Sequence, residues 1–167
     1  MAWRRVMRLL FFHPLPEVNV ISIQKNDFNV GDEYAALVEK DTASGAVVTF
    51  VGRVRNVNLT RDVLGLHLEH YPGMTEKALQ EIVVQAQSRW QILRWRIIHR
   101  IGDLQLGENI VFVGVSSAHR EDAFHAAEFL MDYLKTSAPF WKKELTTDGS
   151  VWLDSQEKDQ RAVKRWE

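Results

Sequence analysis

Cysteine is absent from the 167 residues of the sequence. The chain therefore forms no disulfide bond and offers neither a thiolate metal ligand nor a cysteine nucleophile, so any sulfur chemistry must use sulfur that another molecule brings. An excess of either charge is also absent, because 21 lysines and arginines stand against 22 aspartates and glutamates, for a formal net charge of −1. A general nucleic-acid-binding protein would show a clear positive excess. Any basic cluster in this chain is consequently a local feature.

Long apolar runs are missing as well. No stretch has the length of a membrane span. The N-terminal apolar run, Leu9–Phe12, is too short for a secretory signal, and no small-residue cleavage site follows it. We therefore expect a cytoplasmic protein. Residues 1–18 are expected to be a mobile extension or the product of a start codon set too far upstream, with an arginine-rich transit peptide as the alternative, and residues 19–167 to form a single domain.

The periodicity of the apolar residues predicts an α+β fold. Helices are expected at 31–40, 71–90, 119–138 and about 155–166. Strands are expected at 45–52, at 63–70, twice within 94–117, and on both sides of the turn at 146–150. The first two strands are expected to form a long-looped hairpin. Because hairpins interrupt the alternation of strands and helices, α+β fits better than a doubly wound parallel sheet.

Two of the predicted helices have recognisable ends. Asp32 is a plausible cap for the helix at 31–40, and Ser116 or Ser117 is a good N-cap for the helix at 119–138. The latter helix should end at or before Ala138, because Pro139 disfavours helical geometry in the residue that precedes it. The apolar stripe of this helix is predicted to consist of Ala123, Phe124, Ala127, Leu130, Met131 and Leu134.

Two basic clusters could bind an anion. The first is Arg53–Val54–Arg55, directly after a strand and a glycine. Arginines in a solvated loop need no function, but paired guanidinium groups also match the geometry of a phosphate or a carboxylate. The second is His119 with Arg120 at a helix N-terminus, where positive charge opposes the helix dipole at a cost below about 1 kcal/mol. That arrangement becomes favourable when an anion binds there.

A third cluster surrounds a proline near the end of the same helix. Lys135 lies close to the apolar stripe, where a lysine commonly runs its aliphatic stem along the core edge. A partly desolvated ammonium group there would also serve as an acid, a base or a nucleophile. Lys142 follows in an extended segment, in which Phe140 and Trp141 can wall a pocket. If the two ammonium groups converge, the pKa of at least one falls below its ordinary value; spacing leaves their convergence open.

Other kinds of site find little support. His67, His70 and His99 lie on predicted strands without a carboxylate at ligand spacing, so core or edge histidines are favoured over a metal site. No glycine-rich phosphate loop or dinucleotide fingerprint follows a strand. The six tryptophans are scattered and are interpreted as packing residues. We predict neither a metal nor a cofactor.

The catalytic, large subunit of molybdopterin synthases resembles this sequence in six segments, FVGRVRN, LEHYPGMTEKAL, IHRIGDLQLGE, VFVGVSSAHR, MDYLKTSAPFWKKE and AVKRW. The resemblance runs in the family's order from about Val20 to the C-terminus. It implies an α/β hammerhead fold with an added antiparallel sheet. It also implies a sulfurtransferase of molybdenum cofactor biosynthesis, which converts cyclic pyranopterin monophosphate (precursor Z) into molybdopterin, the pterin that later binds molybdenum.

The resemblance also implies partners and site residues. In the family, both sulfurs come from the C-terminal thiocarboxylate of a small ubiquitin-like subunit that ends in Gly-Gly, and a homodimer of large subunits lies at the centre of a heterotetramer. Neither nucleic acid nor a membrane is implied. The family's motifs place catalysis on Lys135 and Lys142. They place substrate binding on Arg53, Val54, Arg55, His119, Arg120, Lys135, Lys142, Lys143 and Glu144. Some relatives have a basic residue near Gln156 that reaches the partner protomer's site, and here the residue is neutral.

Two further interpretations stay open at this stage. A non-catalytic module could bind a ubiquitin-like tail without turnover, although the presence of both lysines and all three clusters disfavours it. A lysine Schiff-base enzyme is the other alternative, and borohydride trapping with a carbonyl substrate would reveal it.

Overall fold

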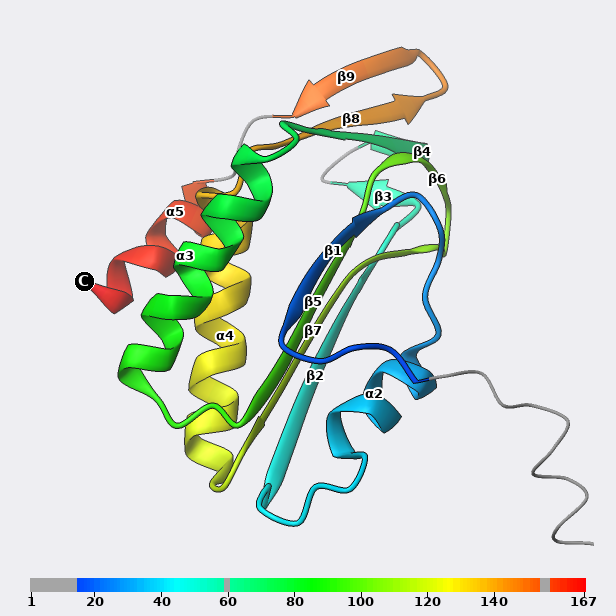
Figure 1. The fold of residues 1–167 in the computed structure, drawn as a ribbon. Coiled ribbons are helices and arrows are strands. Elements are labelled where there is room, and N and C mark those ends of the chain that lie inside the picture. Colours follow the sequence, from blue (N-terminus) through cyan, green and yellow to red (C-terminus); the bar gives the residue numbers. More distant parts are fainter. Residues whose placement is uncertain (1–14, 59–60, 154–156) are drawn as a thin grey trace, which may run out of the picture.

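The protein has a mixed architecture of two β-sheets and flanking helices (Figure 1), which confirms the α+β prediction. The computed structural model describes residues 15–58, 61–153 and 157–167. The strands are β1 (Val20–Gln24), β2 (Ala46–Arg53), β3 (Val57–Asn58), β4 (Arg61–His70), β5 (Arg94–Arg100), β6 (Gly102–Gln105), β7 (Asn109–Ser117), β8 (Phe140–Thr146) and β9 (Gly149–Leu153). The helices are α2 (Val30–Val38), α3 (Met74–Arg89), α4 (Arg120–Thr136) and α5 (Glu157–Val163), followed by the short 3-10 helix η1 (Lys164–Trp166).

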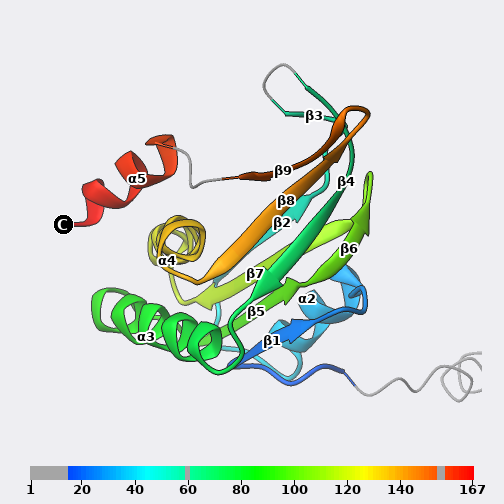
Figure 2. The same cartoon turned by 90° about the horizontal axis from the view of Figure 1, so that it is seen from above.

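The first sheet is the centre of a layered structure, with strand order β1-β5-β7-β2. Figure 2 shows α3 and α4 on one side of this sheet and α2 on the other. Successive side chains of a strand point to opposite faces, so Ile97 packs into the core cluster beneath α3 and α4, whereas Ile98 packs with Phe112 and Leu37 beneath α2. The apolar character of β5 and β7 follows from this burial on both faces.

The second sheet lies across one end of the first and has the order β3-β4-β8-β9, with β6 also paired to β4 (Figure 1). The predicted hairpin between 45–52 and 63–70 is wrong, because β2 pairs with β7 in the first sheet and β4 pairs with β8 in the second. The segment 94–117 contains three strands instead of two, since β6 crosses to the second sheet. Apolar alternation predicts which face of a strand is buried but not which strand lies beside it.

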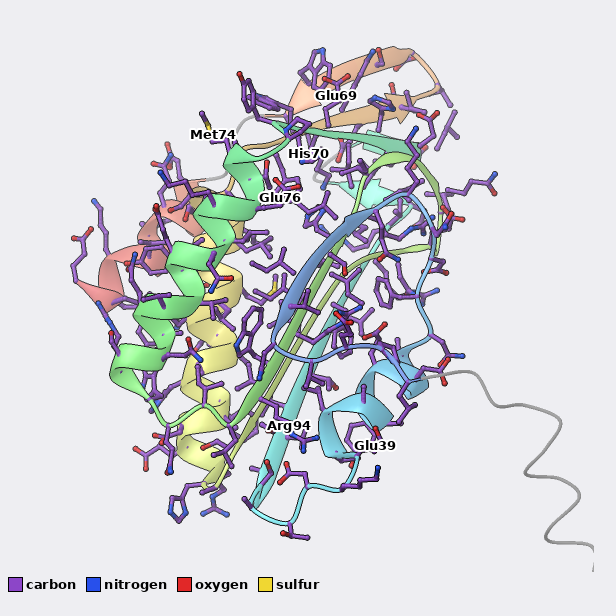
Figure 3. The ribbon with its side chains drawn as sticks, viewed as in Figure 1. Glu39, Glu69, His70, Met74, Glu76 and Arg94 are labelled. Atoms are coloured by element: carbon purple, nitrogen blue, oxygen red, sulfur yellow. The ribbon has the colours of Figure 1, made fainter. Side chains whose placement is uncertain are left out.

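A tight connection joins the second sheet to α3. Strand β4 ends at His70 and the helix begins at Met74, so the two elements meet at one corner of the molecule (Figure 3). Gly73 has a φ of 82°, a conformation that glycine adopts without steric cost. The Glu76 carboxylate accepts a hydrogen bond of 2.6 Å from the Gly73 amide, which satisfies one of the free donors at the helix start.

The helix caps differ from the predicted ones. The N-cap of α2 is Asn29, whose side-chain oxygen accepts hydrogen bonds of 2.8 and 3.2 Å from backbone amides of the first turn, the second of them that of Asp32. The N-cap of α4 is His119, which makes no side-chain capping bond. Ser116 and Ser117 are fully buried at the end of β7 instead. The strand and the helix lie where they were predicted, but the two serines belong to the strand and do not cap the helix.

The apolar stripe of α4 was also predicted incompletely. Phe124 is 62% exposed, whereas Ala126 and Phe129 are fully buried and were not predicted to belong to the stripe. The buried face of α4 is thus rotated away from Phe124. Because an exposed aromatic side chain has the same sequence spacing as a buried one, periodicity did not separate the two.

The C-terminal elements are fastened to α4. The Trp166 indole donates a hydrogen bond of 2.8 Å to the Asp132 carboxylate, and Arg165 forms an ion pair of 2.8 Å with Glu128. These contacts hold α5 and η1 beside the second half of α4. No helix in the described ranges is long and apolar enough to cross a membrane.

Asn19, directly before β1, is hydrogen-bonded to the backbone of β5. Its amide donates a hydrogen bond of 2.7 Å to the Trp95 carbonyl, and its side chain accepts one of 3.0 Å from the Trp95 amide. Val18 adds a partly buried contact to the cluster beneath α2. Residues 1–14 lie outside the described residues.

We expect that removal of residues 1–18 leaves turnover unchanged and lowers the free energy of unfolding by about 1 kcal/mol or less, the contribution of a partly buried valine. Removal of residues 1–17 is the matched control, because it retains Val18. Thermal melts and activity assays of both variants test this expectation. A truncated chain that misfolds or loses activity would show that the N-terminal segment is structural.

Candidate functional site

One pocket brings together the two sheets and α4. It has a volume of about 640 Å³. Its walls come from β2, β4, β5, β7, β8, β9, the second half of α4, and α5. The lining side chains are Phe50, Val51, Gly52, Arg53, Arg55, Leu68, His99, Ile110, Val111, Met131, Leu134, Lys135, Ala138, Phe140, Lys142, Leu153 and Asp159. Residues that are far apart in the sequence thus surround a single cavity.

The two candidate catalytic lysines both line this pocket. Lys135 lies in the last turn of α4, and Lys142 lies on β8. The chain between the two lysines passes through Pro139. Burial is the largest cause of a lowered pKa at Lys142, and the nearby charge of Lys135 acts in the same direction. The sequence left the convergence of the two groups open, and the structure places them at one cavity.

Further charges surround the Lys142 ammonium group. Arg55 also lowers the pKa of Lys142, whereas the carboxylates of Glu144 and Asp159 oppose that shift. Asp159 is additionally 3.9 Å from the Lys135 ammonium group. Glu144 is buried and shares the face of β8 on which Lys142 lies. Four cationic side chains and the Asp159 carboxylate therefore line the pocket, and the Glu144 carboxylate, which does not line it, lies close enough to Lys142 to affect its pKa.

Alternation along β8 separates Lys142 from its neighbours. Phe140 and Lys142 line the pocket, and Trp141 and Lys143 do not. The Lys143 ammonium group lies 5.4 Å from the ring centre of Trp152 on β9 instead, in a cation–π contact. The prediction that Trp141 walls the pocket is therefore wrong, because this side chain is 47% exposed on the opposite face.

The arginine cluster is held in place by the valine between its members. Val54 is buried in a cluster with Val63, Leu66, Leu68 and Leu104, and it does not line the pocket. Both flanking arginines do line it. The backbone therefore turns the valine into the core and the two guanidinium groups toward the cavity.

The two arginines have different surroundings. Arg53 follows a register shift at the end of β2, and its Nε donates a hydrogen bond of 3.0 Å to the Gly107 carbonyl. This bond occupies one edge of the Arg53 guanidinium group. Arg55 makes no hydrogen bond or ion pair with a described residue, so its donors are available to a ligand.

His119 and Arg120 lie elsewhere. They stand at the N-terminus of α4, both exposed, and neither lines the pocket. Helix α4 has 17 residues, so Arg120 and Lys135 are roughly 22 Å apart along the axis, at about 1.5 Å per residue. The two ends of α4 point to opposite ends of the molecule (Figure 1). Within one chain, this cluster and the lysines do not meet.

Two titratable residues of the pocket were not predicted from the sequence. His99 was interpreted as a core or edge histidine, although its position two residues after the buried Ile97 indicated the pocket-side face of β5. Asp159 lies in a polar terminal helix that carried no signal of a site. Gln156, the neutral residue near the expected dimer-shared site, lies outside the described residues. In the described part of the chain, no group of three histidine or acidic residues could hold a metal ion.

The arrangement suits an anionic ligand that reacts. Donors that carry positive charge face a cavity with apolar walls, where electrostatic interactions are stronger than in water. A cation with a lowered pKa can also release a proton near neutral pH more readily than an exposed lysine. The geometry therefore favours binding of a phosphate or carboxylate together with acid–base or electrostatic catalysis.

Known proteins share this fold and much of this sequence. The sequence model described as "MoaE protein" matches residues 23–137. A Vibrio cholerae protein named molybdopterin synthase catalytic subunit is 63% identical, over 88% of this chain and 97% of that protein. The solved structure of the molybdopterin biosynthesis MoaE protein from Burkholderia ambifaria is 48% identical, with a TM-score of 0.75 over 88% of this chain and 97% of the other. That of molybdopterin synthase from Staphylococcus aureus is 34% identical, with a TM-score of 0.74 over 80% and 96%.

Proposed function

The chain belongs to the MoaE family, and on that basis we propose that it is the catalytic subunit of a molybdopterin synthase. It converts precursor Z into molybdopterin by transferring two sulfurs from the C-terminal thiocarboxylate of a small ubiquitin-like subunit. The observation that carries the proposal is the pocket in which Arg55, Lys135 and Lys142 face one cavity. A substrate phosphate and a thiocarboxylate are both anions, and this pocket offers each of them a cation.

The two lysines have different roles in the proposed reaction. The thiocarboxylate sulfur bonds to a carbon of the substrate, and water then attacks the acyl carbon of the partner's tail to form a tetrahedral intermediate, whose negative oxygen needs a nearby cation. We assign that role to Lys135 at the end of α4. Collapse of this intermediate leaves the sulfur on the substrate and a carboxylate on the tail. The oxygen that leaves the substrate needs a proton, and we assign its donation to Lys142, because a buried ammonium group with a lowered pKa gives up its proton more readily.

The substrate phosphate is held by arginine. Arg55 supports this assignment because it lines the pocket and makes no ion pair with a described residue. His119 and Arg120 belong to the same substrate only if a second copy of the chain brings the start of its α4 to this pocket. The homodimer expected for the family supplies that second copy, and each site then contains residues of both protomers.

A partner subunit is required because the chain has no sulfur of its own in a reactive form: it has no cysteine. The name catalytic subunit, which the Vibrio cholerae relative bears, fits a role beside a second subunit. We propose that the Gly-Gly tail of this small subunit enters the pocket beside Lys135. Glycines suit such a path because they allow close approach of the backbone.

The function is tested by incubating the protein with precursor Z and a thiocarboxylated small subunit and then detecting molybdopterin. A small subunit without its terminal Gly-Gly is the control, and it should give no product while retaining much of its docking surface. Product formation with the tailless subunit would refute the sulfur route. Absence of product with the complete subunit would refute the function.

Arg55→Ala is expected to weaken the binding of precursor Z by about tenfold or more. A charge-assisted hydrogen bond to a phosphate contributes about 1.5–3 kcal/mol, and each 1.4 kcal/mol is about a factor of ten. Titration calorimetry with the wild type measures the difference, with the exposed Lys77→Ala on α3 as the matched loss of a positive charge outside the pocket. Equal affinities for all three proteins would place the phosphate elsewhere.

A further inference from the structure

His99 lines the pocket, but the roles proposed above for the lysines and arginines do not involve it. It lies on β5, is 6% exposed, and lines the cavity. Its ring stacks on that of Phe140, with 3.7 Å between ring centres and 16° between planes. Phe140 itself lines the pocket from β8. The two stacked rings thus form a flat wall that joins the first sheet to the second.

The protonation of the His99 ring follows from its contacts. Nδ1 lies 2.8 Å from the Arg100 carbonyl oxygen, and because a carbonyl oxygen only accepts hydrogen bonds, Nδ1 carries the proton. Burial lowers the pKa of His99 to about 4, the hydrogen bond to the Arg100 carbonyl opposes this shift, and the charge of His70 adds to it. The ring is therefore neutral near pH 7, and Nε2 has a free lone pair.

Few of the polar side chains that line this pocket offer a hydrogen-bond acceptor. The arginine and lysine side chains that line it have only N–H donors, and the Asp159 carboxylate is beside Lys135 at 3.9 Å. Among the described residues, none donates a hydrogen bond to Nε2 of His99. The cyclic phosphate diester of precursor Z and a thiocarboxylate carry no O–H group at this pH and present only acceptors, so they would gain nothing from such an atom. A nitrogen heterocycle with ring N–H groups would gain a hydrogen bond.

We propose that Nε2 of His99 accepts a hydrogen bond from an N–H group of the substrate's pterin ring system, so that His99 is a positioning residue that sets the orientation of the heterocycle. The inference rests on the proposed function and deepens it, because it divides the pocket into two parts. The cationic groups bind the anionic ends of the reactants, and the neutral imidazole binds the heterocycle. The stack on Phe140 and the bond to Arg100 hold the ring in the required tautomer and orientation.

Two substitutions distinguish positioning from packing. His99→Phe keeps an aromatic ring for the stack on Phe140 but removes the acceptor, whereas His99→Gln loses the stack but can place a carbonyl oxygen near the position of Nε2. We expect His99→Phe to raise KM for precursor Z roughly tenfold, with a smaller change in kcat, because the N–H of the ligand is left without a partner. His99→Gln should recover part of the loss. A packing role predicts the reverse order, and that order would overturn the inference.

Binding of sulfate serves as the second arm, because sulfate is a tetrahedral anion without an O–H donor at this pH. It should be unchanged in His99→Phe, because sulfate meets the cations and needs no acceptor; a parallel loss of sulfate and precursor Z binding would mean that the substitution damages the whole pocket and would overturn the proposal. In ¹⁵N-histidine-labelled wild type, the Nε2 resonance of His99, assigned with His99→Gln, should shift upfield on addition of precursor Z and stay in place with sulfate. An unmoved resonance in a wild type that makes molybdopterin overturns this inference alone. A wild type that makes no molybdopterin overturns the proposed function with it.

Discussion

Lys142→Ala is expected to lower molybdopterin formation by about 100-fold or more, the cost of removing one group that stabilises charge in a transition state, while the neighbouring Lys143→Ala changes it little. The two lysines are adjacent on β8, and successive side chains of a strand point to opposite faces. Lys142 lines the pocket, whereas Lys143 lies over Trp152 on the far side of the sheet. The pair is therefore a matched comparison of the same residue type on the same strand.

Lys135→Ala should cause a loss of the same order, and Lys135→Arg should not restore activity, because a guanidinium group is bulkier and planar and does not place its charge where the compact ammonium group stood. Thermal melts control for folding. Lys142→Ala should melt at or above the wild-type temperature, since it removes an ammonium group whose charged form burial disfavours. Near-normal turnover in Lys135→Ala would refute its catalytic role, and equal losses at Lys142 and Lys143 would refute the facing of β8.

The elements of the fold were largely predictable from local patterns, and their pairing was not. Strand β2 and helices α3 and α4 fall close to their predicted ranges because apolar spacing reports burial directly. The partner of β2 is β7, more than fifty residues away in the sequence, and no local pattern encodes such a contact. The added strand β6 was missed because it has only four residues, starts with Gly102 and is followed by a turn that contains Gly107, a composition that resembles a loop.

For the site as well, the types of residue involved were predictable from the sequence, and their positions relative to one another were not. Each basic cluster was recognisable because its cationic residues are close together in the sequence, at the end of a strand or at the start or end of a helix. Their grouping depends on the fold: Arg55 and Lys142 meet through the contact between the first and second sheets, and the length of α4 keeps Arg120 from joining them. Period-two alternation would already have excluded Trp141 from the wall that contains Phe140 and Lys142. His99 gave no signal by type, because neutral buried histidines are common in cores.

The separation along α4 leads to a test of the shared site. If Lys135 of one chain and the His119–Arg120 pair of another serve the same substrate, a homodimer of Lys135→Ala has two defective sites, and so has a homodimer of the double variant His119→Ala/Arg120→Ala. A mixed dimer of the two variants is different. Both defects fall into one of its sites, and the other site contains only wild-type residues. The double variant alone should lose about 100-fold or more in affinity for precursor Z, as two charge-assisted hydrogen bonds are removed.

Mixing the two inactive variants is therefore expected to restore activity. Random exchange makes about half of the dimers mixed, each with one intact site of two, so the mixture should reach about a quarter of the wild-type rate. The assay is molybdopterin formation after the two variants are unfolded together and refolded, with each variant refolded alone as the control. A mixture of Lys135→Ala with Lys142→Ala is the matched negative control, because both residues line the pocket of one chain and no mixed dimer has an intact site. If the first mixture stays as inactive as the second, His119 and Arg120 do not act across the dimer, and the anion site at the start of α4 does not serve the lysine pocket.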